Sequence, residues 1–435
     1  MTKILITGTY TSLNNGTMAM VVSTVKALRK SISDARFVLL SNCPETDKKR
    51  YEQHRIKVVE RIWKRDEKRS KSHLLCLMVY ALLSLFRCVM WRVYKFFNLN
   101  LKLKGTIGEY VTADAIIDLS GDSLSDDYGT LPLCEILYSI LFGIIVKKPV
   151  IIYAQSIGPF KTPLTRTLAK FILNRVNMIT VREKITKNYL QKFGINKPPI
   201  YLTADSAFLL EPASVKTVDK ILIREGLAEN NKIRIGISPN RIIHRWSFPE
   251  SKCLKEKHKR YIELMAEITD YLIEKLNATV ILIPHVMIPN NDDRTTSKEI
   301  YEKLRNKHDV KLIMNEYTAE EMKGIIGRCD MFIGCRMHAI IASTSTCVPT
   351  IAMAYSHKTH GIIGEMLGQE EFVVDVRNLY FDSLLSEILS KIDILWLERD
   401  RVRENLRQKI KEIQKRASYN VELTVNLIKS SGGNY

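Results

Sequence analysis

The sequence lacks several patterns that mark common functional classes. Its eight cysteines form no CxxC pair and have no histidine at zinc-finger spacing, which argues against a disulfide framework and a structural zinc site. There is no GxGxxG fingerprint and no Walker lysine, so neither a dinucleotide site nor a P-loop is indicated. No run reaches the roughly 18 to 20 uncharged apolar residues of a membrane-spanning helix. The segment from Lys3 to Gly8 has the pattern of a buried strand instead of a signal peptide, and we expect a cytoplasmic protein.

What the sequence does contain is an excess of positive charge. Lys and Arg number 66 against 47 Asp and Glu, which gives a formal net charge of +19 over 435 residues. Such an excess is compatible with nucleic acid, an anionic membrane surface or an anionic substrate. About half of it lies in residues 61–104, which hold 11 cationic and two acidic side chains.

This segment, 61–104, combines a basic run with an apolar helical pattern that contains embedded cations. In one interpretation it is an inserted helix packed on the protein, with its cations in solvent. In the other it lies in the headgroup layer of an anionic membrane, with Trp91, Tyr94, Phe96 and Phe97 as anchors. We favour the membrane and expect a peripheral protein at the inner face of the plasma membrane. Nucleic acid is not expected, because the cations are interleaved with Leu and Met instead of stacking aromatics.

Short apolar, β-branched segments alternate with amphipathic helical patterns along most of the chain, as in α/β proteins with parallel sheets. Strands are predicted to begin near Lys3, Arg36, Asp114, Pro149, Met178, Tyr201, Ile233, Thr279, Val310, Met331 and Thr350. Two such arrays in series predict two doubly wound Rossmann-like domains facing a cleft. We expect a first domain at 1–212 with the insertion 61–104, a second at 232–392, and a C-terminal helix and tail at 393–435.

Polar side chains follow the predicted strands of the first half, where the ligand crevice of a parallel sheet is expected. A loop rich in small polar residues precedes a helix after the first strand, and two further polar segments read LSGDSLSDDYG and AQSIGPF. The candidate ligand-binding residues here are Asn15, Gly16, Ser120, Gly121, Asp122, Asp126, Gln155 and Ser156. Each segment alone is equally compatible with an ordinary capped loop.

Cationic and imidazole side chains follow other predicted strands. Arg182 follows the strand MIT, Arg336 and His338 follow MFIG, and His357 and Lys358 follow TIAMAY. Neighbouring parallel strands bring the last two turns side by side, and Arg, His and Lys together favour an anion site with an acid/base. An isolated arginine or histidine at such a position is more often structural.

Seven ordered motifs resemble the polysaccharide pyruvyl transferase family: NNGTMA, DLSGDSLSDDYG, AQSIGPF, ITVRE, TADSAFLL, CRMHA and AYSHKTHG. The likeness extends from Ile4 to about Gly368, apart from the basic insertion. It implies a GT-B-like fold, phosphoenolpyruvate as donor and a sugar diol as acceptor, on a surface polysaccharide or a lipid-linked oligosaccharide precursor of the cell envelope. The products would be a pyruvate ketal and phosphate, and no metal or organic cofactor is required.

The resemblance also implies roles for individual residues. Arg182 and Arg336 would hold the phosphate and carboxylate of phosphoenolpyruvate, His338 would act as acid/base, and Lys358 with His357 would complete the donor site. The eight candidates of the first half would then contact the acceptor. Two alternatives remain open: a GT-B glycosyltransferase that uses a nucleotide sugar on a membrane-linked glycan, and a non-catalytic scaffold at the membrane.

Overall fold

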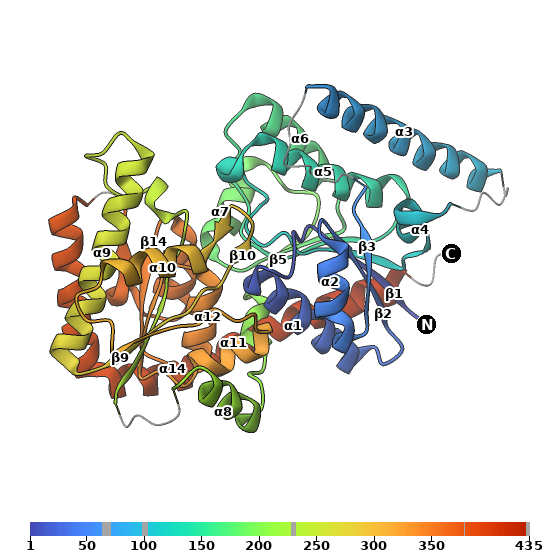
Figure 1. The fold of residues 1–435 in the computed structure, drawn as a ribbon. Coiled ribbons are helices and arrows are strands. Elements are labelled where there is room, and N and C mark those ends of the chain that lie inside the picture. The colour runs from blue at the N-terminus through green and yellow to red at the C-terminus, as the bar shows by residue number, and fades with distance from the viewer. Residues whose placement is uncertain (63–70, 98–102, 228–231, 378, 432–435) are drawn as a thin grey trace. The chain divides into compact units, whose positions relative to one another are not determined.

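The computed structural model describes residues 1–62, 71–97, 103–227, 232–377 and 379–431, without the side chains of residues 71–78, 80, 81 and 357. The chain divides into two compact units, and each is described here by itself (Figure 1). The first unit comprises Met1–Ser12, Met20–Ser206 and Arg416–Tyr435, and the second comprises Leu13–Ala19 and Ala207–Lys415.

These limits differ from the predicted domain boundaries. The main segment of the second unit begins at Ala207 instead of 232 and so includes residues 207–231. Leu13–Ala19 groups with the second unit because its backbone is hydrogen bonded to 285–287. The C-terminal helix α14 (Phe381–Ser431) begins well before the predicted 393 and contributes to both units. Its buried apolar positions start at Leu384 and recur at Ile388 and Ile392, so the stripe that stabilises the helix reaches back to its first turn.

The first unit is built on a seven-stranded, all-parallel sheet in the order β3-β2-β1-β4-β5-β6-β7. Its strands are β1 (Lys3–Thr7), β2 (Arg36–Ser41), β3 (Ile56–Glu60), β4 (Ala115–Asp118), β5 (Val150–Gln155), β6 (Met178–Val181) and β7 (Ile200–Leu202). The order reverses between β1 and β4, as in a doubly wound sheet, and this is where ligands bind in such folds. β3 was not predicted, because only alternate residues of this edge strand are buried.

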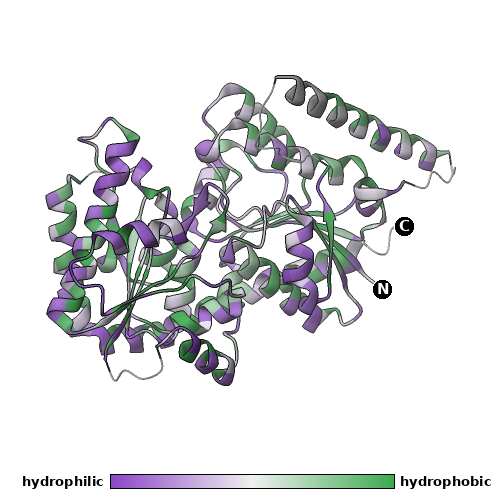
Figure 2. Cartoon of the chain, viewed as in Figure 1, coloured by the Kyte–Doolittle hydropathy of each residue, from purple (hydrophilic) through white to green (hydrophobic). Residues whose placement is uncertain are grey.

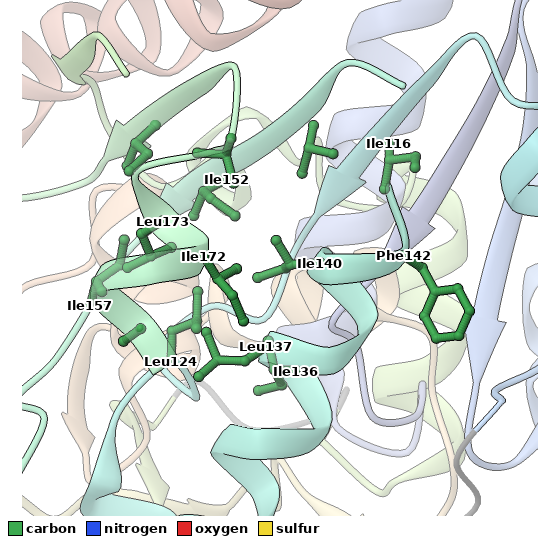
Figure 3. Packing of buried hydrophobic residues seen from close by; sticks show 14 of the residues in the cluster. Ile116, Leu124, Ile136, Leu137, Ile140, Phe142, Ile152, Ile157, Ile172 and Leu173 are labelled. Atoms are coloured by element: carbon green, nitrogen blue, oxygen red, sulfur yellow. The ribbon is translucent and has the colours of Figure 1, made fainter. Parts of the chain in front are cut away.

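Helices cover this sheet and form its core. They are α1 (Asn15–Ser31), α2 (Pro44–Tyr51), α3 (Lys71–Phe96), α4 (Gly105–Thr112), α5 (Thr130–Ile145), α6 (Pro163–Leu173) and α7 (Lys184–Phe193). Figure 3 shows the apolar contact that α5 and α6 make with β4 and β5. Gly143 allows α5 to approach closely, because a Cβ there would lie 2.6 Å from Val150 and 2.7 Å from Ile116.

The second unit contains a six-stranded parallel sheet in the order β12-β9-β8-β13-β14-β15. Its strands are β8 (Arg234–Ser238), β9 (Thr279–Leu282), β12 (Val310–Leu312), β13 (Met331–Gly334), β14 (Thr350–Ala354) and β15 (Val373–Asp375), with a hairpin of β10 (Met287–Ile288) and β11 (Asn291–Asp292). Its helices are α8 (Val215–Arg224), α9 (Leu254–Leu276), α10 (Asp293–Lys303), α11 (Ala319–Ile326), α12 (Met337–Ser345) and α13 (His357–Thr359), followed by a π-helical turn (His360–Met366). A capping box begins α11, with Thr318 and Glu321 bonding each other's backbone. Two doubly wound parallel sheets are therefore confirmed.

The helix α3 of the basic insertion packs on the first unit along one side only. Figure 1 shows it lying over α5, and the side chains of Leu85, Cys88 and Trp91 join the core of that unit. Much of its opposite face is apolar and exposed, and hydrophobic residues line the described part of α3 in Figure 2. Those exposed side chains are Val79, Leu82, Leu83, Phe86, Val89, Val93, Tyr94, Phe96 and Phe97. No helix in the described ranges has both the length and the hydropathy needed to cross a membrane.

Candidate functional site

The second unit gathers polar side chains at the carboxyl ends of adjacent strands. Arg336 follows β13 as the N-cap residue of α12, and His338 lies in the first turn of that helix. His285 follows β9, which is the second neighbour of β13 across β8. Asp293 opens α10 directly after the hairpin. We refer to Arg336, His338, His285 and Asp293 as the Arg336 cluster.

Arg336 is held in a fixed orientation by Asp293. Its Nε donates to Oδ2 of Asp293 over 3.0 Å and its Nη2 donates to Oδ1 over 2.6 Å, while Nη2 also bonds Asn291 over 2.9 Å. Both partners of this fork are buried. Burial lowers the pKa of Arg336, but the charge and hydrogen bonds of Asp293 outweigh it, and the net pKa is raised. The guanidinium therefore stays charged and oriented.

The first loop of the chain lies against His338. A Cβ at Gly16 would lie 2.4 Å from Nδ1 of His338, so only glycine leaves room for the imidazole there. The neighbouring Asn15 N–H donates to the carbonyl oxygen of His285 over 3.0 Å. Asn15 and Gly16 were predicted to belong to an acceptor site in the first domain. In the structure they lie in the second unit, next to the Arg336 cluster, and their contact with the acceptor stays a prediction.

Lys358 and His357 lie in the short helix α13, directly after β14. Lys358 is buried, with 3% of its surface exposed. The backbone of His357 opens the helix, and its side chain is outside the part that the structure describes. Because β14 pairs with β13, both residues follow a strand adjacent to the one that precedes Arg336. The predicted adjacency of these two strands is confirmed.

Arg182 lies in the first unit and has its own partners there. Its Nε donates to Oγ of Ser156 over 2.8 Å, and its Nη1 donates to Asp205 over 2.5 Å. Ser156 in turn donates to Glu183 over 2.9 Å. Burial lowers the pKa of Arg182, but the Asp205 and Glu183 carboxylates outweigh it and raise the net pKa. With 1% of its surface exposed, Arg182 orders the ends of β5 and β6, and its predicted contact with the donor stays a prediction.

Gln155 and Ser120 form a second buried network around Asp118. Gln155 Nε2 donates to Oδ1 of Asp118 over 2.6 Å, and the Ser120 hydroxyl bonds both Asp118 and Gln155 over 2.6 and 2.8 Å. A register irregularity in β5 places Ala154 at a φ of +52°. Such irregularities re-aim the side chains that follow them. These two acceptor candidates therefore shape the sheet edge through internal bonds.

The three remaining candidates follow β4 in the first unit. Gly121 has a φ of +67°, a backbone conformation that favours glycine. Asp122 is half-buried and accepts a bond from the Tyr128 hydroxyl over 2.7 Å. Asp126 accepts from the backbone of Lys161 over 2.5 Å and from the hydroxyl of Thr165 over 2.7 Å at the start of α6. This pattern is typical of a structural cap. Both Asp122 and Asp126 are half-buried.

His285 and Asp293 were not predicted as site residues. A strand was predicted to begin near Thr279; β9 ends at Leu282, and His285 follows it beyond the carboxyl end of the strand. Asp293 accepts backbone N–H groups of Arg241 and Val286 as well as the Arg336 fork. The sequence signal for His285 was its position shortly after an apolar strand. Arg336 was located by the same rule, that ligand-binding side chains follow the carboxyl ends of parallel strands.

Comparison with solved structures places the fold among GT-B-like proteins. A glycosyltransferase from Rickettsia africae superposes with a TM-score of 0.57 at 12% identity, covering 100% of this chain and 99% of that one. HepE from Anabaena, solved in complex with UDP-glucose, gives 0.59 at 12%, covering 98% and 100%. A UDP-GlcNAc 2-epimerase from Neisseria meningitidis gives 0.58 at 11%, again covering 98% and 100%. At these identities the likeness establishes the architecture alone.

The sequence comparison identifies the family. The family model for polysaccharide pyruvyl transferase matches residues 16–357, and this chain belongs to that family of transferases. The amylovoran biosynthesis protein AmsJ of Erwinia amylovora is 27% identical over 284 residues, which cover 64% of this chain. The match spans 66% of that relative, just under two thirds of its length. The predicted resemblance to this family is confirmed.

Proposed function

We propose that this protein transfers a pyruvyl group from phosphoenolpyruvate to a sugar diol, forming a cyclic ketal and releasing phosphate. The observation that carries the proposal is the Arg336 fork, fixed by Asp293 beside His338 at the N-terminus of α12. Asp293 and Asn291 accept from Nε and from both N–H groups of Nη2, so the two N–H groups of Nη1 remain to bind a carboxylate or phosphate, and the guanidinium keeps its charge. The N–H groups at the start of α12 add a partial positive charge for the same anion.

The chemistry requires one proton donor and two hydroxyl nucleophiles. His338 protonates the methylene carbon of phosphoenolpyruvate, and the first sugar hydroxyl attacks the central carbon and gives up its proton to the site. The C–O bond to phosphate then breaks, and the second hydroxyl closes the ketal. Of the two hydroxyl protons released, one replaces the proton given to the methyl group and the other leaves with the phosphate.

A histidine suits this proton exchange, because its ordinary pKa lies near 6.5. Acid/base catalysis of this kind typically contributes about 10² to 10⁴ in rate. Lys358 would balance the charge of the departing phosphate.

The acceptor is proposed to be a surface polysaccharide or a lipid-linked oligosaccharide precursor. Family membership and the similarity to an amylovoran biosynthesis protein support a polysaccharide. Ser120, Gln155 and Ser156 use their side chains in internal bonds, so they would act by fixing the backbone of the sheet edge. Asp122, half-buried beside them, is the carboxylate that we expect to contact a hydroxyl.

One incubation tests this function. The protein is supplied with phosphoenolpyruvate and extracted lipid-linked glycans, and phosphate release is followed together with the mass of the glycan. We expect release that His338→Ala lowers by at least about 10²-fold. His308→Ala is the matched control, because the side chain of His308 is 96% exposed and lies away from the cluster. Release of a nucleotide diphosphate from a nucleotide sugar, without use of phosphoenolpyruvate, would refute the proposal in favour of a glycosyltransferase.

We also propose that the exposed apolar face of α3 binds the headgroup layer of an anionic membrane. Leu82, Phe86 and Phe96 are 65%, 61% and 82% exposed, which is a large apolar surface to leave in water. The net charge of +9 in 61–104 complements anionic lipid, which attracts nearby cations by about 1 kcal/mol each. Trp91, predicted as an anchor, instead packs into the core with Lys95 5.6 Å above its ring. Tyr94, Phe96 and Phe97 retain the exposure that an anchor needs.

Vesicle flotation tests this membrane contact with a matched pair of variants. Leu82 on α3 and Leu164 on α6 are both exposed, at 65% and 58%. A glutamate on a membrane-bound face loses apolar burial and is repelled by anionic lipid. We expect Leu82→Glu to reduce flotation with phosphatidylglycerol vesicles at least fivefold and Leu164→Glu to leave it unchanged. Equal flotation of the two variants would contradict the proposal.

A further inference from the structure

His285 is fixed in the Arg336 cluster by its backbone. Its N–H lies 3.3 Å from Oδ2 of Asp293, the oxygen that also receives Nε of Arg336. Its carbonyl oxygen accepts the N–H of Asn15 over 3.0 Å. The residue is thus tied both to the carboxylate that orients Arg336 and to the loop that packs on His338. Only 4% of its surface is exposed.

The imidazole of His285 is unusual for a buried side chain. Within the described residues, no protein group forms a hydrogen bond with its Nδ1 or its Nε2. A buried polar atom without a hydrogen bond costs about 1 to 3 kcal/mol, so a ring with two such atoms destabilises the fold. By contrast, His258 in the same unit bonds Glu299 through Nε2 over 2.7 Å. If His285 only filled space in the core, an apolar ring at this position would pack equally well.

The charges around His285 determine its protonation. Burial lowers its pKa, the electrostatic effect of the neighbouring His338 and Arg336 lowers it further, and the pKa lies well below the ordinary value. The groups that face it are therefore His338 and Arg336 from α12 and Asp293 from α10. Its ring is neutral near pH 7, with one N–H donor and one acceptor nitrogen.

We propose that His285 is a third ligand-contacting residue of this site, and that its ring N–H donates to the anionic group held by Arg336. The proposal rests on the proposed function in one respect, which is that the anion in the reaction is phosphoenolpyruvate. A neutral donor suits this position because it adds a directed hydrogen bond without repelling Arg336. The ligand would then form a hydrogen bond with a ring nitrogen that has none in the protein. Functional sites often contain groups that lower stability in this way but contribute to binding.

The test replaces the ring by one of similar shape without nitrogen. We expect His285→Phe to raise KM for phosphoenolpyruvate at least tenfold, whereas its melting temperature without ligand stays equal to or above that of the wild type. Inorganic phosphate, the product, should raise the melting temperature of the wild type and lose this effect in His285→Phe. His308→Phe is the control and should match the wild type in all three measurements. His285→Gln, which keeps an amide donor, should recover part of the phosphate effect.

The outcomes separate this inference from the proposed function. If His285→Phe keeps KM within twofold and keeps the phosphate shift, His285 is structural and the inference fails. If the wild type consumes no phosphoenolpyruvate but shows a phosphate shift that depends on His285, the proposed function fails and the anion contact stands. If His285→Phe does not fold, His285→Leu, which also lacks a hydrogen-bond donor, carries the same measurements, and an unchanged KM in that variant overturns the inference.

Discussion

A single methyl group at Gly16 should displace the imidazole of His338, the proposed acid/base. In Gly16→Ala the new Cβ would lie 2.4 Å from Nδ1, 2.6 Å from Cγ and 2.8 Å from Cβ of His338. Non-bonded heavy atoms are attracted at about 3.5 to 4.0 Å and repel strongly below that distance. The ring must therefore withdraw by about 1 Å, because Gly16 is fixed in the first turn of α1 by Oδ1 of Asn14.

The size of the effect follows from that displacement. A misplacement of about 1 Å in a catalytic arrangement can cost about 10²-fold in rate, which corresponds to roughly 2.7 kcal/mol in the barrier. The fold itself should lose little, since alanine is preferred to glycine in a helix by up to about 1 kcal/mol. We therefore expect kcat to fall about 10²-fold while the melting temperature changes by only a few degrees.

The assay is phosphate release from phosphoenolpyruvate, measured in a double-mutant cycle with His338→Ala. In that background two of the three close contacts are gone, so Gly16→Ala should change the residual rate by less than about threefold. The ¹⁵N resonances of His338 should also shift in Gly16→Ala, which reports the displacement without reference to activity. A kcat within threefold of the wild type, or effects of the two substitutions that add, would refute this reasoning.

Two further predictions concern buried charges of the second unit. Asp293→Asn should lower the free energy of unfolding in urea by about 3 kcal/mol, because it leaves the buried Arg336 without its carboxylate; a loss below 1 kcal/mol would contradict this account. Lys323 donates to Leu210 O over 2.6 Å, and burial lowers its pKa to about 7. Between that pKa and 10.5 the unfolded chain holds the proton and the folded chain does not, so stability rises with pH. Lys323→Met should lose this rise, and its stability relative to the wild type should fall by about 1 kcal/mol per pH unit; a difference independent of pH would refute it.

Local sequence patterns were sufficient to predict most strands of the two parallel sheets. The segment RFVLLS is continuous, apolar and bounded by polar residues, and β2 spans those residues from Arg36 to Ser41. The capping box at Thr318 and Glu321 was likewise predictable, since both partners lie within four residues. Two of the four edge strands, β7 and β12, were predicted near Tyr201 and Val310, whereas β3 and β15 were not. In β3 only alternate residues are buried, and β15 is a short segment of three residues. Their pairing depends on neighbours distant in sequence.

The sequence predicted the cationic and imidazole residues of the candidate site, but it did not predict the residues that bond to them. The rule that ligands bind beyond the carboxyl ends of parallel strands located Arg336, His338 and Lys358. It did not find Asp293, because the fork joins residues 43 positions apart through side chains. It also assigned Gly16 to the first domain by order along the chain. The backbone bonds to 285–287 that place it beside His338 leave no pattern in the sequence.

The two arginines differ in the number of carboxylates around them, which bears on which one would hold the proposed donor. Arg182 contacts Asp205 and lies close to Glu183, so two carboxylates surround one guanidinium. Arg336 contacts one carboxylate, Asp293, and stands at the positive end of α12. Phosphoenolpyruvate carries several negative charges, and each carboxylate in a site of low dielectric opposes its entry. This balance favours the Arg336 cluster for the phosphate, with Arg182 acting through the order it gives to Ser156 and the end of β5.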